Sequence, residues 1–144
     1  WAWRAESLPS DLPENIQATH DYLSIAVEFD NGLDLTYMWS TELAEGTIFQ
    51  CPLPWWDQRE THWVLRNDHE KLGHWLQERR SLLADYRRAI GGEPPERVVA
   101  VWLIANSVFQ RGEGRCRYRD IGFDNADGHH PVWTVAQGAA ESAS

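Results

Sequence analysis

Two acidic residues, Glu28 and Asp34, flank a turn and could act as an acid–base pair. They lie on either side of Asp-Asn-Gly (30–32), within a run of alternating apolar and polar residues, 22–40. This pattern predicts two antiparallel strands joined by a hairpin turn. A three-residue loop with Gly32 in the left-handed conformation places Glu28 opposite Asp34. Because like charges there destabilise a sheet by about 0.2–1 kcal/mol, the pair needs a cation or a shared proton.

The same register predicts one apolar and one polar face for the hairpin. The apolar face contains four cross-strand pairs: Leu23 with Trp39, Ile25 with Tyr37, Val27 with Leu35, and Phe29 with Leu33. The polar face includes Thr36 beside the two carboxylates. Two interpretations of the carboxylates stay open: a solvated or arginine-bridged pair, and a binding or acid–base role.

Three arginines could supply the missing positive charge. Arg115, Arg117 and Arg119 alternate with other residues in "RCRYRD", so a regular strand would carry all three guanidinium groups on one face. Such a ladder either pairs with neighbouring carboxylates, for which Glu28 and Asp34 are the candidates, or holds an anionic ligand bidentately.

A second candidate site is the tryptophan pair in "PLPWWDQ". Trp55 and Trp56 point in opposite directions on an extended segment, so we expect one indole to be accessible. With Asp57 beside it, that indole would offer a flat apolar surface next to hydrogen-bonding groups, as sugar sites do. The alternative is that both rings pack against a helix or a partner chain.

The elements that must position these groups include one predicted long amphipathic helix, about residues 68–90. Asn67 can cap its start with Glu70 in a capping box, and Gly91 and Gly92 end it. Its apolar stripe predicts that it covers a sheet. The stripe residues are Leu72, Trp75, Leu76, Arg79, Leu82, Leu83, Tyr86 and Ile90.

Several further strands are predicted. The run "RVVAVWLIANSVF" is apolar at both alternating positions, which predicts a strand in the middle of a sheet. Weaker strand signals cover 47–50, 61–66 and 130–135. We expect one domain over residues 1–136, and the small polar residues 137–144 predict a disordered tail.

Composition narrows the function classes. The 144 residues carry a net charge of −9, which disfavours binding to nucleic acid, and no apolar run is long enough for a membrane span. Cys51 and Cys116 are 65 positions apart, and a disulfide and two free thiols are both open. No zinc-knuckle spacing, phosphate loop or dinucleotide fingerprint occurs, so no metal site and no cofactor are expected.

The runs "WAWRAESLP", "DYLSIAVEFDNG", "LTYMWST", "LGHWLQERRSLLADYRRAIGGEPP" and "RYRDIGF" occur in this order. Over about residues 1–123 the chain resembles the bacterial family called domain of unknown function 3047. The resemblance implies a jelly-roll-like antiparallel β-sandwich with one prominent helix, in exported proteins of the periplasm or cell exterior. It implies no established activity. Similar family members begin further upstream with a signal peptide, which implies that this chain is shortened at its N-terminus.

Three hypotheses for function follow. The leading one is an exported β-sandwich module that binds a glycan or another amphipathic small molecule through Trp55, Trp56, Asp57 and Thr36. The second is a lyase or hydrolase in which Glu28 and Asp34 are the acid–base pair and the three arginines hold an anionic substrate. The third is an accessory subunit whose tryptophans are buried against a protein partner.

Overall fold

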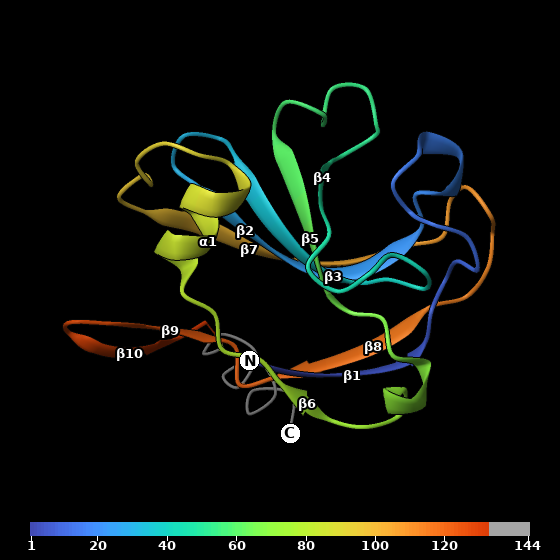
Figure 1. Cartoon of the computed structure of the whole chain (residues 1–144). Coiled ribbons are helices and arrows are strands. Elements are labelled where there is room, and N and C mark those ends of the chain that lie inside the picture. The colour runs from blue at the N-terminus through green and yellow to red at the C-terminus, as the bar shows by residue number, and fades with distance from the viewer. Residues whose placement is uncertain (133–144) are drawn as a thin grey trace, which may run out of the picture.

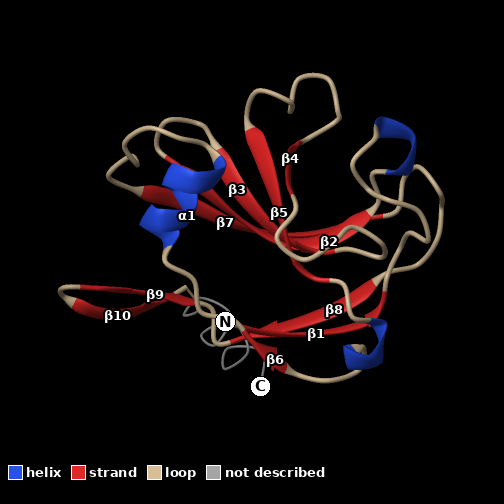
Figure 2. Ribbon diagram, in the orientation of Figure 1, coloured by secondary structure: helices blue, strands red, loops and turns tan. Residues whose placement is uncertain are grey.

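The computed structural model describes residues 1–132 and has a mainly β fold, as the sequence predicts (Figures 1 and 2). A five-stranded sheet has the order β4 (Ile48–Gln50), β5 (Glu60–Arg66), β3 (Asp34–Trp39), β2 (Tyr22–Phe29), β7 (Val98–Asn106). A three-stranded sheet has the order β6 (Leu76–Gln77), β1 (Ala2–Ser7), β8 (Arg115–Arg119), and β9 (Gly122–Asn125) pairs with β10 (Gly128–Pro131). All strand pairs between described residues are antiparallel except β3 with β5, which is parallel.

The β2–β3 hairpin forms with the predicted register. Gly32 has φ 82°, and the amide of Phe29 donates to the carbonyl of Leu33 across the three-residue loop. Glu28 therefore lies opposite Asp34. Gly32 is needed here because a residue with a Cβ rarely adopts this left-handed conformation.

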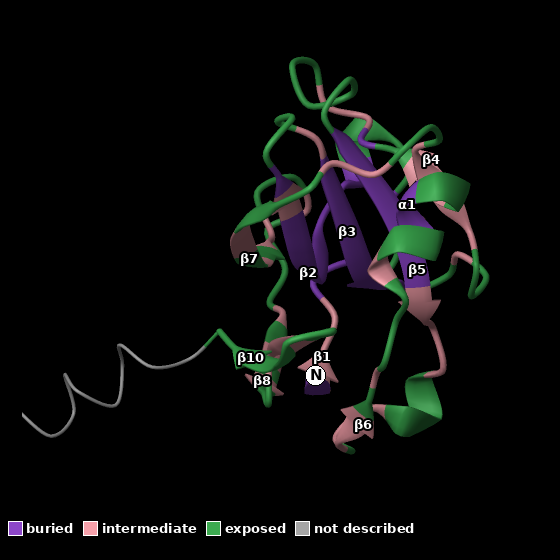
Figure 3. Ribbon diagram, turned by 90° about the vertical axis from the view of Figure 1, so that its left-hand side faces the viewer, coloured by how far each residue is buried: buried purple, intermediate pink, exposed green. Residues whose placement is uncertain are grey.

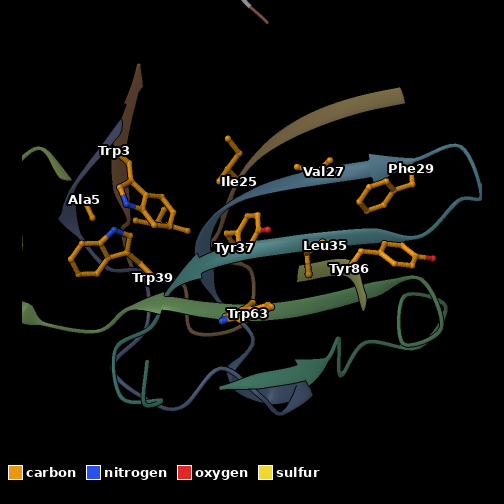
Figure 4. Close-up of a cluster of buried hydrophobic side chains, with 11 residues drawn as sticks. Trp3, Ala5, Ile25, Val27, Phe29, Leu35, Tyr37, Trp39, Trp63 and Tyr86 are labelled. Atoms are coloured by element: carbon orange, nitrogen blue, oxygen red, sulfur yellow. The ribbon is translucent and has the colours of Figure 1, made fainter. Parts of the chain in front are cut away.

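The apolar face of the hairpin packs toward the three-stranded sheet and forms the main core (Figure 4). Trp39 from β3 lies 6.3 Å from Trp3 of β1, and Trp3 lies equally far from Tyr118 of β8. Large aromatic side chains from both sheets thus fill the space between them, which is the main hydrophobic contribution to the fold. The prediction that Tyr37 and Trp39 are core residues is confirmed.

The predicted long helix over 68–90 is wrong in its length. The segment contains a 3-10 turn, η2 (His69–Lys71), then β6, and only then α1 (Leu82–Ala89). Asp68, not Asn67, accepts the capping hydrogen bond from the amide of Glu70. Gly73 has φ 79° in a turn and donates its amide to the carbonyl of Ala5, which holds this turn against β1.

Part of the predicted apolar stripe does pack on the core, but not along one continuous helix. Leu72, Leu76 and Leu82 all pack on the main core, but Leu72 does so from a turn, Leu76 from the short strand β6, and only Leu82 from a helix. The apolar spacing thus predicted several of the inward-facing residues, although Arg79 and Leu83 of the stripe are exposed. It predicted the wrong backbone, because the contacts with β1 outweigh local helix propensity. No helix among the described residues has the length and apolar character needed to cross a membrane.

Strand β7 lies at the edge of its sheet, not in the middle as predicted (Figure 3). Among residues 1–132 it pairs with β2 alone, and Trp102 and Leu103 on its two faces are 52% and 48% exposed. The apolar composition of β7 predicted that other parts of the chain pack on both of its faces. Instead, among the described residues, many side chains on both faces of β7 are exposed.

The weaker strand signals have mixed outcomes. Strands at 47–50 and 61–66 are confirmed as β4 and β5. Of the strand predicted at 130–135, residues 130 and 131 belong to β10, and 133–135 lie outside the described residues, as does the predicted tail 137–144.

Candidate functional site

A cleft of about 710 Å³ opens between the two larger sheets on the side of α1 and β9. Its inner wall is apolar and is built from the β2, β3 and β7 side chains Ile25, Val27, Tyr37 and Val101. These residues alternate along their strands, so the pattern that forms the core also lines the cleft.

One polar group is fixed in this wall. The Arg80 guanidinium donates two hydrogen bonds to the Asp85 carboxylate, at 2.8 and 2.9 Å, and lies 4.8 Å over the Trp63 ring. The hydroxyl of Tyr37 donates to the same carboxylate at 2.6 Å. The hydrogen bonds to Asp85 raise the pKa of Arg80, and burial raises the pKa of Tyr37, so this wall keeps a charged guanidinium and a neutral hydroxyl.

The mouth of the cleft is polar and exposed. Asp124 of β9 lies 3.2 Å from a guanidinium nitrogen of Arg79 and 2.7 Å from Nδ1 of His129. The hydrogen bond with His129, helped by the charge of Arg79, lowers the pKa of Asp124. The mouth therefore offers both donors and acceptors around an apolar interior.

On the opposite face of the five-stranded sheet, four side chains form a buried polar cluster: His20, Cys51, Glu60 and His62. None is more than 6% exposed, and their donor atoms all lie within 4.8 Å of one another. His20 follows η1 (Gln17–Thr19), Cys51 follows β4, and Glu60 and His62 lie two apart on β5, hence on one face.

The cluster has a defined protonation pattern. Burial, with a smaller effect from His62, lowers the pKa of His20 to about 4, so its ring is neutral near pH 7. Burial raises the pKa of Cys51 to about 11, so it is a thiol. Burial alone would raise the pKa of Glu60, but His62 and the Tyr22 hydroxyl outweigh burial and lower it. Glu60 is therefore the anionic member of the set.

A family model described as "Protein of unknown function (DUF3047)" matches residues 1–122. The chain belongs to this family. The match confirms the resemblance seen over residues 1–123 and contains the buried polar cluster and the inner wall of the cleft. Searches of curated proteins and of solved structures found no match to the chain.

In this DUF3047 chain the tryptophan pair lies on an exposed loop away from the cleft. Trp55 is 89% exposed and Trp56 47% exposed, and the following Asp57 is exposed as well. The loop turns tightly here, with the amide of Trp56 donating to the carbonyl of Leu53 and Trp55 at φ 77°. Both indoles are thus accessible, and neither lines the cleft.

The carboxylates meet as predicted, but on the face that carries the buried polar cluster. Asp34 and Thr36 are buried, and the Thr36 hydroxyl donates to Asp34 at 3.2 Å. Burial and the nearby Glu60 raise the pKa of Asp34 to about 7. The protonated form of Asp34 is therefore favoured below about pH 7, and its acid–base role stays a prediction.

The predicted pairing of the arginine ladder with these carboxylates is wrong. The three arginines lie together on β8, in the other sheet, where Arg117 lies 3.2 Å from Glu6 and Arg119 lies 4.1 Å over the Trp75 ring. Arg115 pairs with Glu113 at 3.3 Å. The pairing fails because β8 joins β1, so it has no register with the β2–β3 hairpin.

The buried polar cluster was missed by the sequence analysis. Its members come from three segments up to 42 positions apart, between His20 and His62, so no short motif contains them. The available signal was the alternation Glu60-x-His62 in a strand, which places two ligand-type side chains on one face.

Proposed function

We propose that the chain is an exported β-sandwich module of jelly-roll type that binds a neutral glycan or another amphipathic small molecule. The cleft between the sheets supports this proposal, since its volume of about 710 Å³ falls within the range typical of small-molecule sites. The family resemblance supports a location in the periplasm or outside the cell.

The chemistry of the cleft fits an amphipathic ligand. Its interior offers Tyr37 and aliphatic side chains, while Arg79, Asp124 and His129 at the mouth offer hydrogen bonds. Sugars present an apolar ring face and a rim of hydroxyl groups, which matches this division. The net charge of −9 favours a neutral ligand over a polyanion.

Calorimetric titration with cellohexaose, xylohexaose and maltohexaose tests the proposal. We expect at least one oligosaccharide to bind. Leu83 lines the cleft and is partly exposed, so Leu83→Arg places a larger, charged side chain there and should weaken binding about tenfold or more. Trp55→Ala is the matched control, because it removes an exposed side chain outside the cleft. Loss of binding with Trp55→Ala and not with Leu83→Arg would move the site to the loop, and no binding of any of the three sugars would refute a neutral-glycan site.

A second candidate function, an accessory subunit, has support from β7. This strand exposes Trp102 and Leu103, and its outer edge has no neighbouring strand in the part of the chain that the structure describes. Sheets add a strand from another chain at such edges. Sedimentation at micromolar concentrations tests it: association that Leu103→Lys abolishes would favour assembly. A monomer that remains unchanged by that substitution would count against self-assembly.

A further inference from the structure

We propose that the buried polar cluster, His20, Cys51, Glu60 and His62, is a structural zinc site. The four side chains offer two imidazole nitrogens, one sulfur and one carboxylate oxygen. This is a donor set that Zn²⁺ accepts in tetrahedral coordination, while Ca²⁺ and Mg²⁺ require oxygen ligands. The proposal is independent of the glycan cleft, which lies on the opposite face of the sheet.

The distances are close to those of a loaded site. Nε2 of His20 lies 3.6 Å from Sγ of Cys51, and Nε2 of His62 lies 2.8 Å from Oε1 of Glu60. Ligand atoms around tetrahedral zinc are about 3.3–3.8 Å apart, given bonds of about 2.0–2.3 Å. Since the cluster spans at most 4.8 Å, side-chain shifts of about 1 Å would complete the geometry.

His20 is already oriented as a ligand. Its Nδ1 lies 2.6 Å from the backbone carbonyl of Glu14, which can only accept, so Nδ1 carries the proton and donates it. Nε2 therefore presents its lone pair to Cys51. Metal-binding histidines are commonly held this way, with the second nitrogen donating to a carbonyl or carboxylate.

His62 lacks one of the two hydrogen bonds that a buried imidazole normally makes. Both ring nitrogens are buried, and Nε2 lies 2.8 Å from Oε1 of Glu60, but Nδ1 has no hydrogen-bond partner among residues 1–132. A buried polar atom without a partner costs about 1–3 kcal/mol. A metal bond to one nitrogen would satisfy that atom. His62 also stacks on Phe49 at 4.9 Å with an interplanar angle of 6°, which fixes the ring plane.

Charge balance also favours a divalent ion. When zinc displaces the Cys51 proton, the thiolate and the Glu60 carboxylate together carry two negative charges and neutralise Zn²⁺. In the metal-free chain the Glu60 carboxylate is stabilised by the Tyr22 hydroxyl, which donates to it at 3.2 Å, and by His62 at 2.8 Å, and bound Zn²⁺ would add full positive charge beside it. The displaced proton leaves to solvent as the S–H bond is replaced by an S–Zn bond.

The site is closed, which makes it structural. Four protein ligands complete a tetrahedron and leave no position for a water or a substrate, whereas catalytic zinc sites keep one position open. All four side chains are buried, and none lines the cleft. We expect the bound zinc to fix residues 8–21, through His20, and the end of β4, through Cys51, on the face of β5 that carries Glu60 and His62.

Metal titration of the full chain tests this proposal. After treatment with EDTA, we expect one equivalent of Zn²⁺ to bind and to raise the melting temperature. Co²⁺ should give the intense d–d bands of tetrahedral coordination and a thiolate-to-cobalt charge-transfer band. Absence of these Co²⁺ bands in the folded wild-type chain would overturn the proposal.

Two cysteine variants assign the sulfur. Cys51→Ser should abolish the charge-transfer band and weaken Zn²⁺ binding by at least about 100-fold, the upper end of the loss seen when only an outer partner is removed. Cys116→Ser is the matched control, since Cys116 lies on β8 in the other sheet, and it should keep both. An equal loss in the two variants would refute the assignment. If Cys51→Ser does not fold, retention of the band in Cys116→Ser still assigns it to Cys51, the other cysteine of the chain.

Discussion

The two faces of strands β2, β3 and β5 are both largely buried, but by different means. The face toward β1 and β8 is apolar and meets another apolar sheet. The opposite face carries Asp34, Thr36, Glu60 and His62 and is covered by loop segments that bring His20 and Cys51. Alternating side chains of the same strands thus contribute to a hydrophobic core on one side and to a polar cluster on the other.

This difference shows what covers a polar strand face. An alternating strand normally leaves its polar side in water. Here the ring of His20 lies 4.5 Å from Tyr22 and 4.8 Å from His62, so loop residues exclude water from that side. Polar groups buried in this way must find partners, which explains the raised pKa of Asp34 and the ligand-like set around Cys51.

The largest expected effect tests the apolar face. Trp39→Ala removes a fully buried indole between the sheets and should lower the free energy of unfolding by about 3–5 kcal/mol, measured by urea denaturation. Trp55→Ala removes an exposed indole and should change it by less than about 0.5 kcal/mol. Similar losses in the two variants would contradict the assignment of Trp39 to the core.

The polar face is tested by the pH dependence of Asp34→Asn. The folded-state pKa of Asp34 is raised to about 7 from 3.8, so the wild-type native state binds the extra proton and loses stability as pH rises from about 4 to 7. Asp34→Asn has no carboxylate at this position and lacks this loss. With both proteins treated with EDTA, the free energy of unfolding of the variant minus that of the wild type should therefore rise by about 2–4 kcal/mol between pH 4 and pH 7.

Urea unfolding at a series of pH values from 4 to 8 measures this difference. Asp57→Asn, on the exposed loop, removes a carboxylate that is not buried and is the control. A stability difference between Asp34→Asn and wild type that does not vary with pH would show that Asp34 is not buried as described.

The wall of the cleft is tested by Asp85→Asn. This change removes the charge that holds Arg80 and weakens the acceptor of the Tyr37 hydroxyl, so a loss of about 1–3 kcal/mol is expected in urea denaturation. Arg79→Gln breaks the exposed pair with Asp124 and should cost less than about 1 kcal/mol. Equal effects would mean that the pair in the wall is as solvated as the pair at the mouth.

The smallest expected effect concerns the turn that sets which residues face which side. Gly32→Ala meets no neighbouring atom within 4 Å, so only the positive φ is penalised, by about 1 kcal/mol in thermal or urea unfolding. Gly32→Asn should lose less, because Asn tolerates the left-handed conformation better than Ala. A larger loss for Asn than for Ala would rule out backbone conformation as the reason for glycine.

The local pattern of apolar and polar residues was enough to predict the β2–β3 hairpin and which residues lie on each of its faces. The three-residue loop ending in Gly32 allows one register that gathers the apolar residues, so the pairing of Glu28 with Asp34 followed from the sequence. The same kind of pattern failed at 68–90. Leucines at helical spacing also suit a turn and a short strand beside β1, and the hydrogen bond from the Gly73 amide to the Ala5 carbonyl holds that turn against β1.

The sequence by itself determined the mainly β fold, the register of β2 with β3 and the inward-facing side of both strands, because these depend on residues close together in the chain. The tertiary structure decided the length of α1, the edge position of β7, the partners of Arg115, Arg117 and Arg119, and the meeting of His20 with Cys51, Glu60 and His62. Each of these depends on which distant segments pack together, and strand alternation sets the face on which a side chain lies but not what covers that face.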